Sequence, residues 1–431
     1  MQSPCRLFIF LFFLLFLSIL PVSGTTPDST RQASNLRLMG VTDSLLSAHE
    51  LLRQASAGIL FYDLCADSIL FSKNAEKLFT PASTQKILVA LAAASVPDTM
   101  VSRTILLGSG SQRRKSFRGD LILRGDADPE LSSADLLKLV EALKKRGIRR
   151  ISGTVYADTS SVVPLPWGKG WSWDDIPYRF LPRLSALPVN KGVALTGADS
   201  ALCTLYQGTP AENPKTPEYT AALFRSLMEQ QDIRIRKQHT GFVKSPPKAL
   251  VLGEVTRSRN QIIIPMLKNS DNLNAEMLLL ALGKEHATPA AATAAGLAQI
   301  GRMMATWGYG SSDYRLTDGS GLSFYNALSP AQLVRALREG FHNSEWLAML
   351  QRALPVAATD GSLKNRMLGT SAAGKVYAKT GTLTGASCLA GYAERPDGTL
   401  LAFAIMIRGY AGSAAQATQL QDQLCVLMTS L

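Results

Sequence analysis

The segment Pro81–Ala94, PASTQKILVALAAA, constrains the fold more than any other part of the 431-residue chain. Residues 87–94 are uniformly apolar, and such a run shortly after a proline is typical of a helix buried in a core. Ser83 and Lys86 stand three residues apart at the start of this helix, so one turn brings a hydroxyl beside an amine. Two interpretations are open: a helix cap with a solvated charge, or a nucleophile with its base.

The second interpretation has a definite chemistry. A serine hydroxyl is a weak nucleophile and needs a nearby base. A lysine partly buried at a helix N-terminus can serve as this base, because desolvation and the helix dipole both disfavour the ammonium form. The same position offers the backbone N–H of Ser83 to an oxyanion. Alone the pattern is weak, since about two Ser-x-x-Lys copies arise by chance in a chain of this length. A second copy occurs at Ser245 and Lys248, where consecutive prolines disfavour the helical turn.

An export signal is predicted for residues 1–24. Arg6 precedes an apolar run over residues 7–20, and small residues lead to Gly24. The alternative is a retained membrane anchor, which needs about 18 to 20 apolar residues, and this run is shorter. We therefore expect the protein to be exported to the periplasm or to another extracytoplasmic location.

The formal net charge of +12 is concentrated in three basic runs, at residues 113–115, 144–150 and 234–237. An exported basic protein is suited to peripheral contact with a membrane surface or an anionic wall polymer. Nucleic acid is not an expected partner, because the basic runs lack interleaved aromatic residues. A solvated face is the simpler explanation of each run.

No metal or other cofactor is expected. The four histidines form no HxxH or HExxH pair, and the cysteines beyond the signal form no CxxC pair. The sequence also lacks Gly-x-Ser-x-Gly, the usual nucleophile elbow. One disulfide among the four cysteines beyond the signal is compatible with an oxidising compartment, but their spacing does not determine which two cysteines pair. These cysteines are Cys65, Cys203, Cys388 and Cys425.

Hydrophobic periodicity predicts a sheet with helices packed on it. Helices are expected at 44–55, 83–94, 132–146, 270–283, 291–308, 329–340 and 414–431, and a hairpin is expected within 58–79. Strands are expected at 117–125, 149–158, 376–383, 388–395 and 400–409, the last two joined by the turn PDG at 396–398. The segment 164–180, rich in Pro and Trp, resists regular assignment. We expect both chain ends, 25–103 and 251–431, to form one domain that an insert over 104–250 interrupts.

Ser270 and Asn272 form a second motif at the start of an expected helix, in KNSDNLNAEM. Helix capping by Ser270 or Asp271 is the alternative interpretation. Ser-x-Asn also occurs at 72–74, where a turn is expected.

The third motif is KTGT, Lys379 to Thr382, within strand-like sequence. Gly381 lets the backbone come close to a ligand, while Lys379 and the hydroxyls of Thr380 and Thr382 form an edge suited to anions. A partial copy of this motif, HTG at 239–241, precedes the second motif and lies in a polar segment, so it does not fit the motif order.

Together the three motifs are far more specific than each alone, and their order is typical of penicillin-binding proteins and class A β-lactamases. Separations of 187 residues from Ser83 to Ser270 and 109 residues from Ser270 to Lys379 indicate an insertion after the first motif. The chain resembles the D-alanyl-D-alanine carboxypeptidase/endopeptidase family of low-molecular-mass penicillin-binding proteins over most of its mature length. The resemblance rests on LFTPASTQK, LRGDADPELSSADLLKLVEALKKRGIRRISGTVYADTS, GWSWDD, MLKNSDNLNAEMLL, TDGSGLS and VYAKTGTLTGASCLAGY.

The resemblance implies an α+β fold. A transpeptidase-type domain, similar to that of penicillin-binding proteins and β-lactamases, has an antiparallel sheet with flanking helices and is interrupted by an inserted α/β domain. It also implies a serine D-Ala-D-Ala carboxypeptidase that acts on peptidoglycan stem peptides through an acyl-serine intermediate and is inhibited covalently by β-lactams. Cleavage of cross-links by the same site stays open.

Matching positions receive roles by the same resemblance. Ser83 would attack the peptide carbonyl and Lys86 would take its proton. Ser270 would relay a proton to the leaving amine, and Asn272 would hold the substrate amide.

Lys379 would sustain a positive potential, and Thr380 and Thr382 would receive the terminal carboxylate. The backbone N–H groups of Ser83 and Thr382 would form the oxyanion hole. The related proteins often nest a third domain in the insert, but here the stretch from 193 to 219 is too short for it. Asp158 and GWSWDD are placed near the stem peptide, although a structural turn is the simpler role for each residue.

Two other functions compete with this assignment. A β-lactamase needs a means to activate the deacylating water, and the nearest match to the usual Glu-x-x-Leu-Asn loop, EGFHN at 339–343, lacks the Leu. A wall-binding scaffold without chemistry is disfavoured by the intact motif residues.

Overall fold

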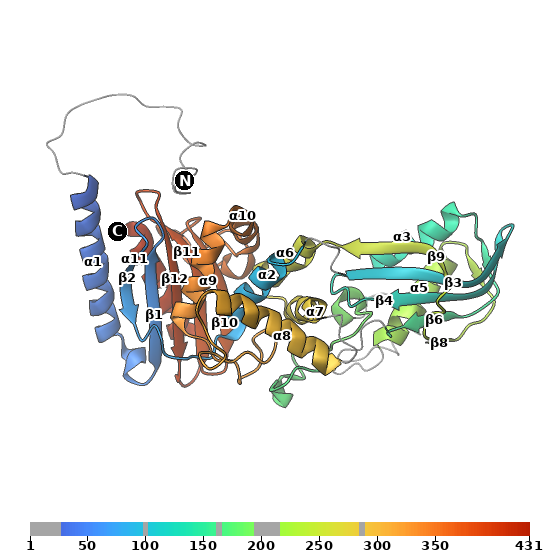
Figure 1. Ribbon diagram of the computed structural model, residues 1–431, viewed down its shortest axis with the longest axis horizontal. Coiled ribbons are helices and arrows are strands. Elements are labelled where there is room, and N and C mark those ends of the chain that lie inside the picture. Colours follow the sequence, from blue (N-terminus) through green and yellow to red (C-terminus); the bar gives the residue numbers. More distant parts are fainter. Residues whose placement is uncertain (1–26, 98–101, 161–165, 194–215, 284–288) are drawn as a thin grey trace, which may run out of the picture. The chain divides into compact units, whose positions relative to one another are not determined.

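The computed structural model describes residues 27–97, 102–160, 166–193, 216–283 and 289–431 (Figure 1). The predicted signal and Cys203 lie outside these ranges. Within them, no helix is both long and apolar enough to cross a bilayer. The chain divides into two compact units. The first contains the chain up to Leu91 with Leu267–Ser270 and Asn326–Leu431, and the second contains Ala92–Met266 and Asp271–Tyr325.

The first unit is built on a five-stranded sheet with the order β10-β11-β12-β1-β2. All neighbouring strands are antiparallel. Its elements are α1 (Pro27–Ala48), η2 (Glu50–Arg53), β1 (Ser56–Asp63), β2 (Ser68–Lys73), η3 (Ala82–Gln85), α2 (Lys86–Ala94, whose end enters the second unit), α9 (Pro330–His342), α10 (Ser344–Ala353), η7 (Gly361–Leu363), β10 (Val376–Leu383), β11 (Ala386–Glu394), β12 (Leu400–Arg408) and α11 (Ala415–Ser430).

The central strands of this sheet are apolar on both faces because helices cover both. Every residue of β12 except Arg408 is buried. Helix α9 packs on β12 and β1, while α11 packs on β11 and β12. The strands predicted at 388–395 and 400–409 correspond to β11 and β12, which pair with each other. In the turn between them Gly398 adopts φ +79°, a left-handed conformation that favours glycine.

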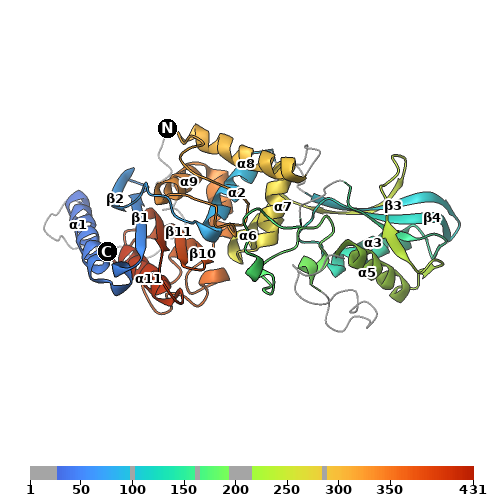
Figure 2. The same cartoon turned by 90° about the horizontal axis from the view of Figure 1, so that it is seen from below.

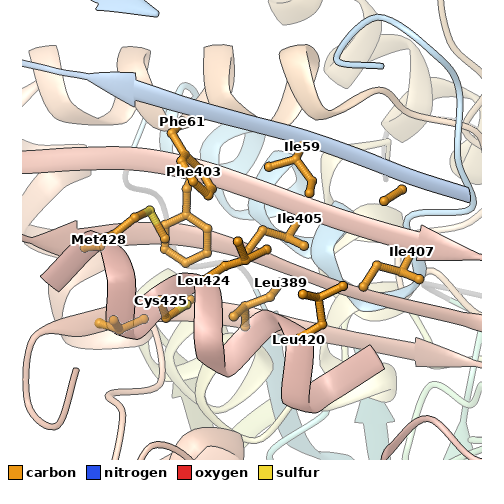
Figure 3. Packing of buried hydrophobic residues seen from close by; sticks show 14 of the residues in the cluster. Ile59, Phe61, Leu389, Phe403, Ile405, Ile407, Leu420, Leu424, Cys425 and Met428 are labelled. Atoms are coloured by element: carbon orange, nitrogen blue, oxygen red, sulfur yellow. The ribbon is translucent and has the colours of Figure 1, made fainter. Parts of the chain in front are cut away.

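A hydrophobic core of the first unit lies between the sheet and α11. Figure 3 shows Ile59 and Phe61 of β1 and alternate residues of β12 facing this helix. Successive strand residues point to opposite faces, so residues two apart share this side. Each fully buried side chain of this kind contributes about 1.5–3 kcal/mol of transfer free energy, and the core therefore holds β10 and β11 rigidly. The helical partners are Leu420, Leu424, Cys425 and Met428.

The second unit contains a seven-stranded mixed sheet. Its path runs β7-β5-β4-β3-β9, and β6 joins β4 to β8. Figure 2 shows β3 and β4 of this sheet with α3 and α5 beside them. Its elements are β3 (Ser102–Arg113), β4 (Ser116–Gly125), α3 (Ser133–Lys145), β5 (Arg150–Ile151), β6 (Val155–Asp158), η4 (Trp173–Asp175), η5 (Val189–Gly192), α5 (Thr216–Gln230), β7 (Arg234–Ile235), β8 (Thr240–Phe242), β9 (Leu250–Arg257), α6 (Arg259–Lys268, whose end enters the first unit), α7 (Asn272–Leu282) and α8 (Pro289–Thr306).

Helix α3 follows its predicted boundaries closely. Ser132 caps it in a capping box with Asp135, and the chain leaves the helix through Gly147 at φ +75°. Its apolar face, with Leu136, Val140 and others, enters a core shared with the sheet and α5. The predicted domain limits at 103/104 and 250/251 fall within β3 and β9, two strands that pair with each other. The assignment of residues 104–250 to a separate domain stays a prediction.

Candidate active site

The Ser83 segment begins with a single 3₁₀ turn. Ser83 lies in η3, and α2 starts at Lys86, so the predicted helix starts one turn later than expected. Lys86 Nζ donates to Ser83 Oγ across 2.6 Å. Lys86 is 0 % exposed, which excludes a solvated charge. Ala82, directly before Ser83, has φ +45°, and such strained backbone in a non-glycine residue is concentrated at functional sites.

A second serine–lysine pair comes from distant parts of the chain. Lys379 of β10 donates from Nζ to Ser270 Oγ (2.8 Å) and to the carbonyl of Thr380 (2.7 Å). Ser270 also has a positive φ, +61°. Lys268, two residues before Ser270, holds this segment in place because its Nζ donates to Leu354 O (2.6 Å).

The two lysines lie close enough to repel each other. Lys379 is 0 % exposed. Burial, and next the positive charge of Lys86, lower the pKa of Lys379 well below its usual value. The site therefore disfavours a second positive charge on Lys379 beside Lys86.

Gly381 brings β10 against the turn that carries Ser83. A Cβ at Gly381 would lie 2.8 Å from Pro81 O and 3.1 Å from Ser83 N, distances that no ordinary side chain tolerates without a shift. Alternation along the strand places Lys379 and Gly381 on one face and Thr380 and Thr382 on the other. The close approach expected at Gly381 is therefore between β10 and the turn that carries Ser83.

The two threonines differ in their surroundings. Thr380 Oγ1 shares a hydrogen bond of 2.8 Å with Ser362 Oγ of η7, whereas Thr382 is exposed. Ser362 was not found from the sequence, because it lies in no recognised motif and reaches the strand only through tertiary folding. The segment 355–357 bonds to the first part of β10, since Ala378 N donates to Pro355 O (3.0 Å) and Ala357 N donates to Val376 O (2.9 Å). As β10 is an edge strand of the sheet, its outer side beyond Ala378 is suited to an extended peptide.

Asn272 belongs to the second compact unit, unlike the other predicted site residues. Its Nδ2 donates to the carbonyl of Phe180 (2.7 Å). The cap of α7 is Asp271, whose side chain accepts from Asn274 N (2.9 Å), so capping explains Asp271 but not Asn272. Within the first unit the structure brings together Ser83, Lys86, Ser270, Lys379 and Thr380.

Asp158 has a structural role in the second unit. It is 1 % exposed and accepts from the backbone N–H groups of Ser160 (2.9 Å) and Ser245 (2.8 Å). Burial raises its pKa, but the hydrogen bonds from Ser160 and Ser245 outweigh burial and leave the pKa below its usual value. The simpler expectation for Asp158, a structural turn, agrees with these contacts.

The TDGSGLS segment contains a buried carboxyl pair that sequence reasoning missed. Glu276 Oε1 accepts from the N–H groups of Gly319 (3.0 Å) and Ser320 (2.7 Å), while Asp318 accepts from the indole of Trp171 (2.8 Å). Burial, and next the neighbouring Asp318, raise the pKa of Glu276 to about 8. Among the described residues, no group of three or more His, Cys, Asp or Glu side chains is suited to a metal ion.

The chain is similar to known proteins over most of its length. The model of the D-Ala-D-Ala carboxypeptidase 3 (S13) family matches residues 39–203 and 206–431. The D-alanyl-D-alanine carboxypeptidase of Actinomadura sp. strain R39 is 28% identical over 479 residues, which cover 94% of this chain and 88% of the relative.

Two solved proteins share the fold. Penicillin binding protein 4 (dacB) from Haemophilus influenzae superposes with a TM-score of 0.75 and 22% identity, covering 89% of this chain and 98% of the other, and it is also known in complex with a β-lactam. The predatory peptidoglycan endopeptidase Bd3459 from Bdellovibrio bacteriovorus has a TM-score of 0.57 and 18% identity, covering 87% and 93%. A penicillin G acylated form of Bd3459 is also known.

The chain belongs to the D-Ala-D-Ala carboxypeptidase 3 (S13) family. It is therefore a serine-type hydrolase of the D-Ala-D-Ala carboxypeptidase class. The predicted fold class is confirmed: an antiparallel sheet with flanking helices, of the penicillin-binding-protein and β-lactamase type, is interrupted by an inserted region.

Proposed function

We propose that the protein hydrolyses the terminal D-Ala-D-Ala bond of peptidoglycan stem peptides through an acyl-enzyme on Ser83. The observation that carries the proposal is the 2.6 Å contact between Lys86 Nζ and Ser83 Oγ, made by a fully buried lysine. A neutral amine at that distance can take the hydroxyl proton as Oγ forms a bond to the peptide carbonyl carbon.

The second serine–lysine pair supplies the return of the proton. When the carbon–nitrogen bond breaks, the departing D-Ala amine needs a proton, and Ser270 relays one from the lysine pair. The 2.8 Å contact from Lys379 Nζ to Ser270 Oγ supports this path. Water then hydrolyses the ester and releases the shortened peptide.

Binding of the substrate uses the edge of β10. Thr380 and Thr382 receive the terminal carboxylate beside the positive charge that the lysine pair retains. The N–H groups of Ser83 and Thr382 stabilise the oxyanion, and the amide of Asn272 holds the substrate backbone. The support from β10 is its position as an edge strand, on which the Thr380 hydroxyl is bonded to Ser362 and Thr382 is exposed.

β-Lactams are proposed as covalent inhibitors at Ser83, because their strained amide presents the same carbonyl to the same nucleophile. The β-lactam complex of penicillin binding protein 4 and the acylated form of Bd3459 support this extension. Cleavage of peptide cross-links is proposed as a second activity, in keeping with the endopeptidase among the structural relatives. An extracytoplasmic location, reached by the predicted signal, follows from a peptidoglycan substrate.

The test is D-Ala release from a D-Ala-D-Ala peptide by the purified protein and by Ser83→Ala. We expect release by the wild-type protein and none by the variant, with matching thermal unfolding curves. Ser245→Ala, in the second Ser-x-x-Lys pattern, is the control and should retain full activity. Release by Ser83→Ala would refute the assignment, and no release by the wild-type protein would favour a scaffold without chemistry. Rapid turnover of penicillin without a lasting adduct would favour a β-lactamase.

A further inference from the structure

The three basic runs of the sequence lie side by side in the second compact unit. The backbone N–H groups of Arg149 and Arg150 donate to the carbonyl of Lys115 (2.8 and 3.2 Å), and the backbone N–H of Arg234 donates to the carbonyl of Arg149 (3.0 Å). The side-chain amide of Gln112 donates to the carbonyls of Arg114 (3.2 Å) and Arg146 (2.7 Å). These bonds join the β3–β4 hairpin, the end of α3 and β7 at one end of the sheet. We call the lysines and arginines of residues 112–118, 144–150 and 232–237 the basic end.

The basic end accounts for nearly all of the net charge of the protein. Its three segments contain twelve Lys and Arg residues and one acidic residue, Asp232, a formal charge of +11. The remaining 33 basic and 32 acidic residues of the chain nearly cancel. The charge is thus a local feature of one surface, which argues against a general solubilising role.

The cations of the basic end repel one another without compensation from carboxylates. Among the described residues, none of them takes part in a salt bridge. Arg150 and Arg234 are register partners of the parallel β5–β7 ladder, and both are exposed. Neighbouring strands lie about 4.8 Å apart, so these like charges stand beside each other at a cost that a bound anion would remove.

The composition of the surface indicates phosphate groups as its ligands. Eight of its twelve cations are arginines, whose planar guanidinium groups bind phosphate oxygens in pairs. Leu250 and Val251 of β9, 46% and 47% exposed, lie beside it, because Arg146 donates from its guanidinium to Val251 O (3.0 Å). Exposed aliphatic side chains next to clustered cations suit the interface of a bilayer, whereas a dissolved polyphosphate offers nothing to them.

We propose that the basic end docks the protein on a bilayer surface that contains anionic phospholipids. The proposal is independent of the chemistry at Ser83. It predicts that binding depends on the anionic lipid fraction, with each neutralised cation weakening it by about 1 kcal/mol, or roughly fivefold.

The test measures cosedimentation of the full-length mature protein with vesicles of phosphatidylglycerol and phosphatidylcholine, and with vesicles of phosphatidylcholine alone. We expect binding to the first kind only, and loss of this binding at about 0.5 M salt because the Debye length then falls below the reach of the charges. A quadruple variant, Arg113→Gln, Arg114→Gln, Arg149→Gln and Arg234→Gln, should bind the anionic vesicles at least ~10-fold more weakly. Its hydrolysis of a soluble D-Ala-D-Ala peptide should be unchanged, which reports that it is folded.

A matched control removes four exposed arginines elsewhere: Arg37→Gln, Arg53→Gln, Arg302→Gln and Arg408→Gln. The control has the same net charge as the first variant and should bind vesicles like the wild-type protein. The proposal is wrong if both variants lose binding equally, or if the wild-type protein ignores phosphatidylglycerol. Binding to soluble polyphosphate without binding to vesicles would also overturn it, and would make a dissolved anionic polymer the ligand.

Discussion

Each compact unit buries a pair of like-charged groups, and the two pairs are stabilised differently. In the second unit, Glu276 and Asp318 accept hydrogen bonds mainly from backbone N–H groups of the turn at 319–323 and from the Trp171 indole. The backbone and indole donors do not titrate near neutral pH, although the Ser320 hydroxyl also bonds to both carboxyl groups. Such a pair holds a turn in place.

In the first unit, Lys86 and Lys379 donate to the hydroxyls of Ser83 and Ser270. A hydroxyl can both donate and accept a proton. The repulsion between the two lysines therefore acts beside groups that are able to transfer protons. The comparison teaches that burial and a neighbouring like charge perturb a pKa in both units, so a perturbed pKa alone does not identify a catalytic group. Glu276, whose pKa is raised, accepts from the backbone of the 319–323 turn, whereas Lys379, whose pKa is lowered, donates to Ser270 and is repelled by Lys86, which donates to Ser83.

The largest expected effect is the loss of acylation in Lys86→Met. The substitution removes the amine that donates to Ser83 Oγ, and general-base catalysis contributes roughly 10²–10⁴-fold. The rate of acylation by penicillin, followed by stopped-flow or by mass spectrometry, should fall by this factor. Lys248→Met, in the second Ser-x-x-Lys pattern, is the control, and an equal fall in both variants would contradict the role of Lys86.

Asp318→Ala should be the most destabilising change in the second unit. It removes the acceptor of the Trp171 indole and of two backbone N–H groups, and unsatisfied buried donors cost about 1–3 kcal/mol each. Urea denaturation should show a loss of about 3–5 kcal/mol. Asp43→Ala, on the exposed side of α1, should stay within about 0.5 kcal/mol of the wild-type protein. Similar losses in the two variants would contradict a structural role for the carboxyl pair.

Gly381→Ala should slow acylation more than it destabilises the fold. The added Cβ meets Pro81 O and Ser83 N, so β10 must move away from the serine turn. We expect acylation to slow by about 10-fold or more, which is about 1.4 kcal/mol in the barrier. Gly40→Ala, where nothing lies within 4 Å of the new Cβ, is the control. Unchanged acylation in Gly381→Ala would show that the close approach is not required.

The last prediction concerns the pH dependence of stability. Since folding raises the pKa of Glu276 from 4.5 to about 8, the folded state keeps a proton that the unfolded chain releases. The associated stability is complete below pH 4.5 and is lost as pH rises toward 8, by at most about 1.4 kcal/mol per pH unit.

Glu276→Gln removes this titration and keeps an oxygen acceptor for Gly319 and Ser320. The difference in unfolding free energy between pH 5.5 and pH 7.5, from urea curves, should therefore be smaller in the variant than in the wild-type protein. Equal slopes in the two proteins would mean that Glu276 is already ionised in the folded state.

Local features of the fold were predictable because their causes are local. The Ser132 cap, the exit of α3 through Gly147 and the turn at 396–398 depend on a few neighbouring residues. The pair of Ser83 and Lys86 needs only one turn of chain, so its contact could be anticipated as well.

Other parts of the site depend on tertiary folding and left no local pattern. The contact of Ser270 with Lys379 joins residues 109 positions apart, and the motif order predicted their role but not their hydrogen bond. Ser362 beside Thr380 and the carboxyl pair with Glu276 have no sequence signal. Helices α5, α6 and α10 were missed, and the pairing of β5 with β7, which assembles the basic end, spans a long and nonlocal connection.

The most direct test of the central claim is mass spectrometry of the mature protein after incubation with benzylpenicillin, followed by peptide mapping. The account predicts one lasting adduct, located on Ser83 and absent in Ser83→Ala. An adduct that maps to another residue, or no adduct together with no cleavage of D-Ala-D-Ala peptides, would contradict the assignment of Ser83 and Lys86 as nucleophile and base.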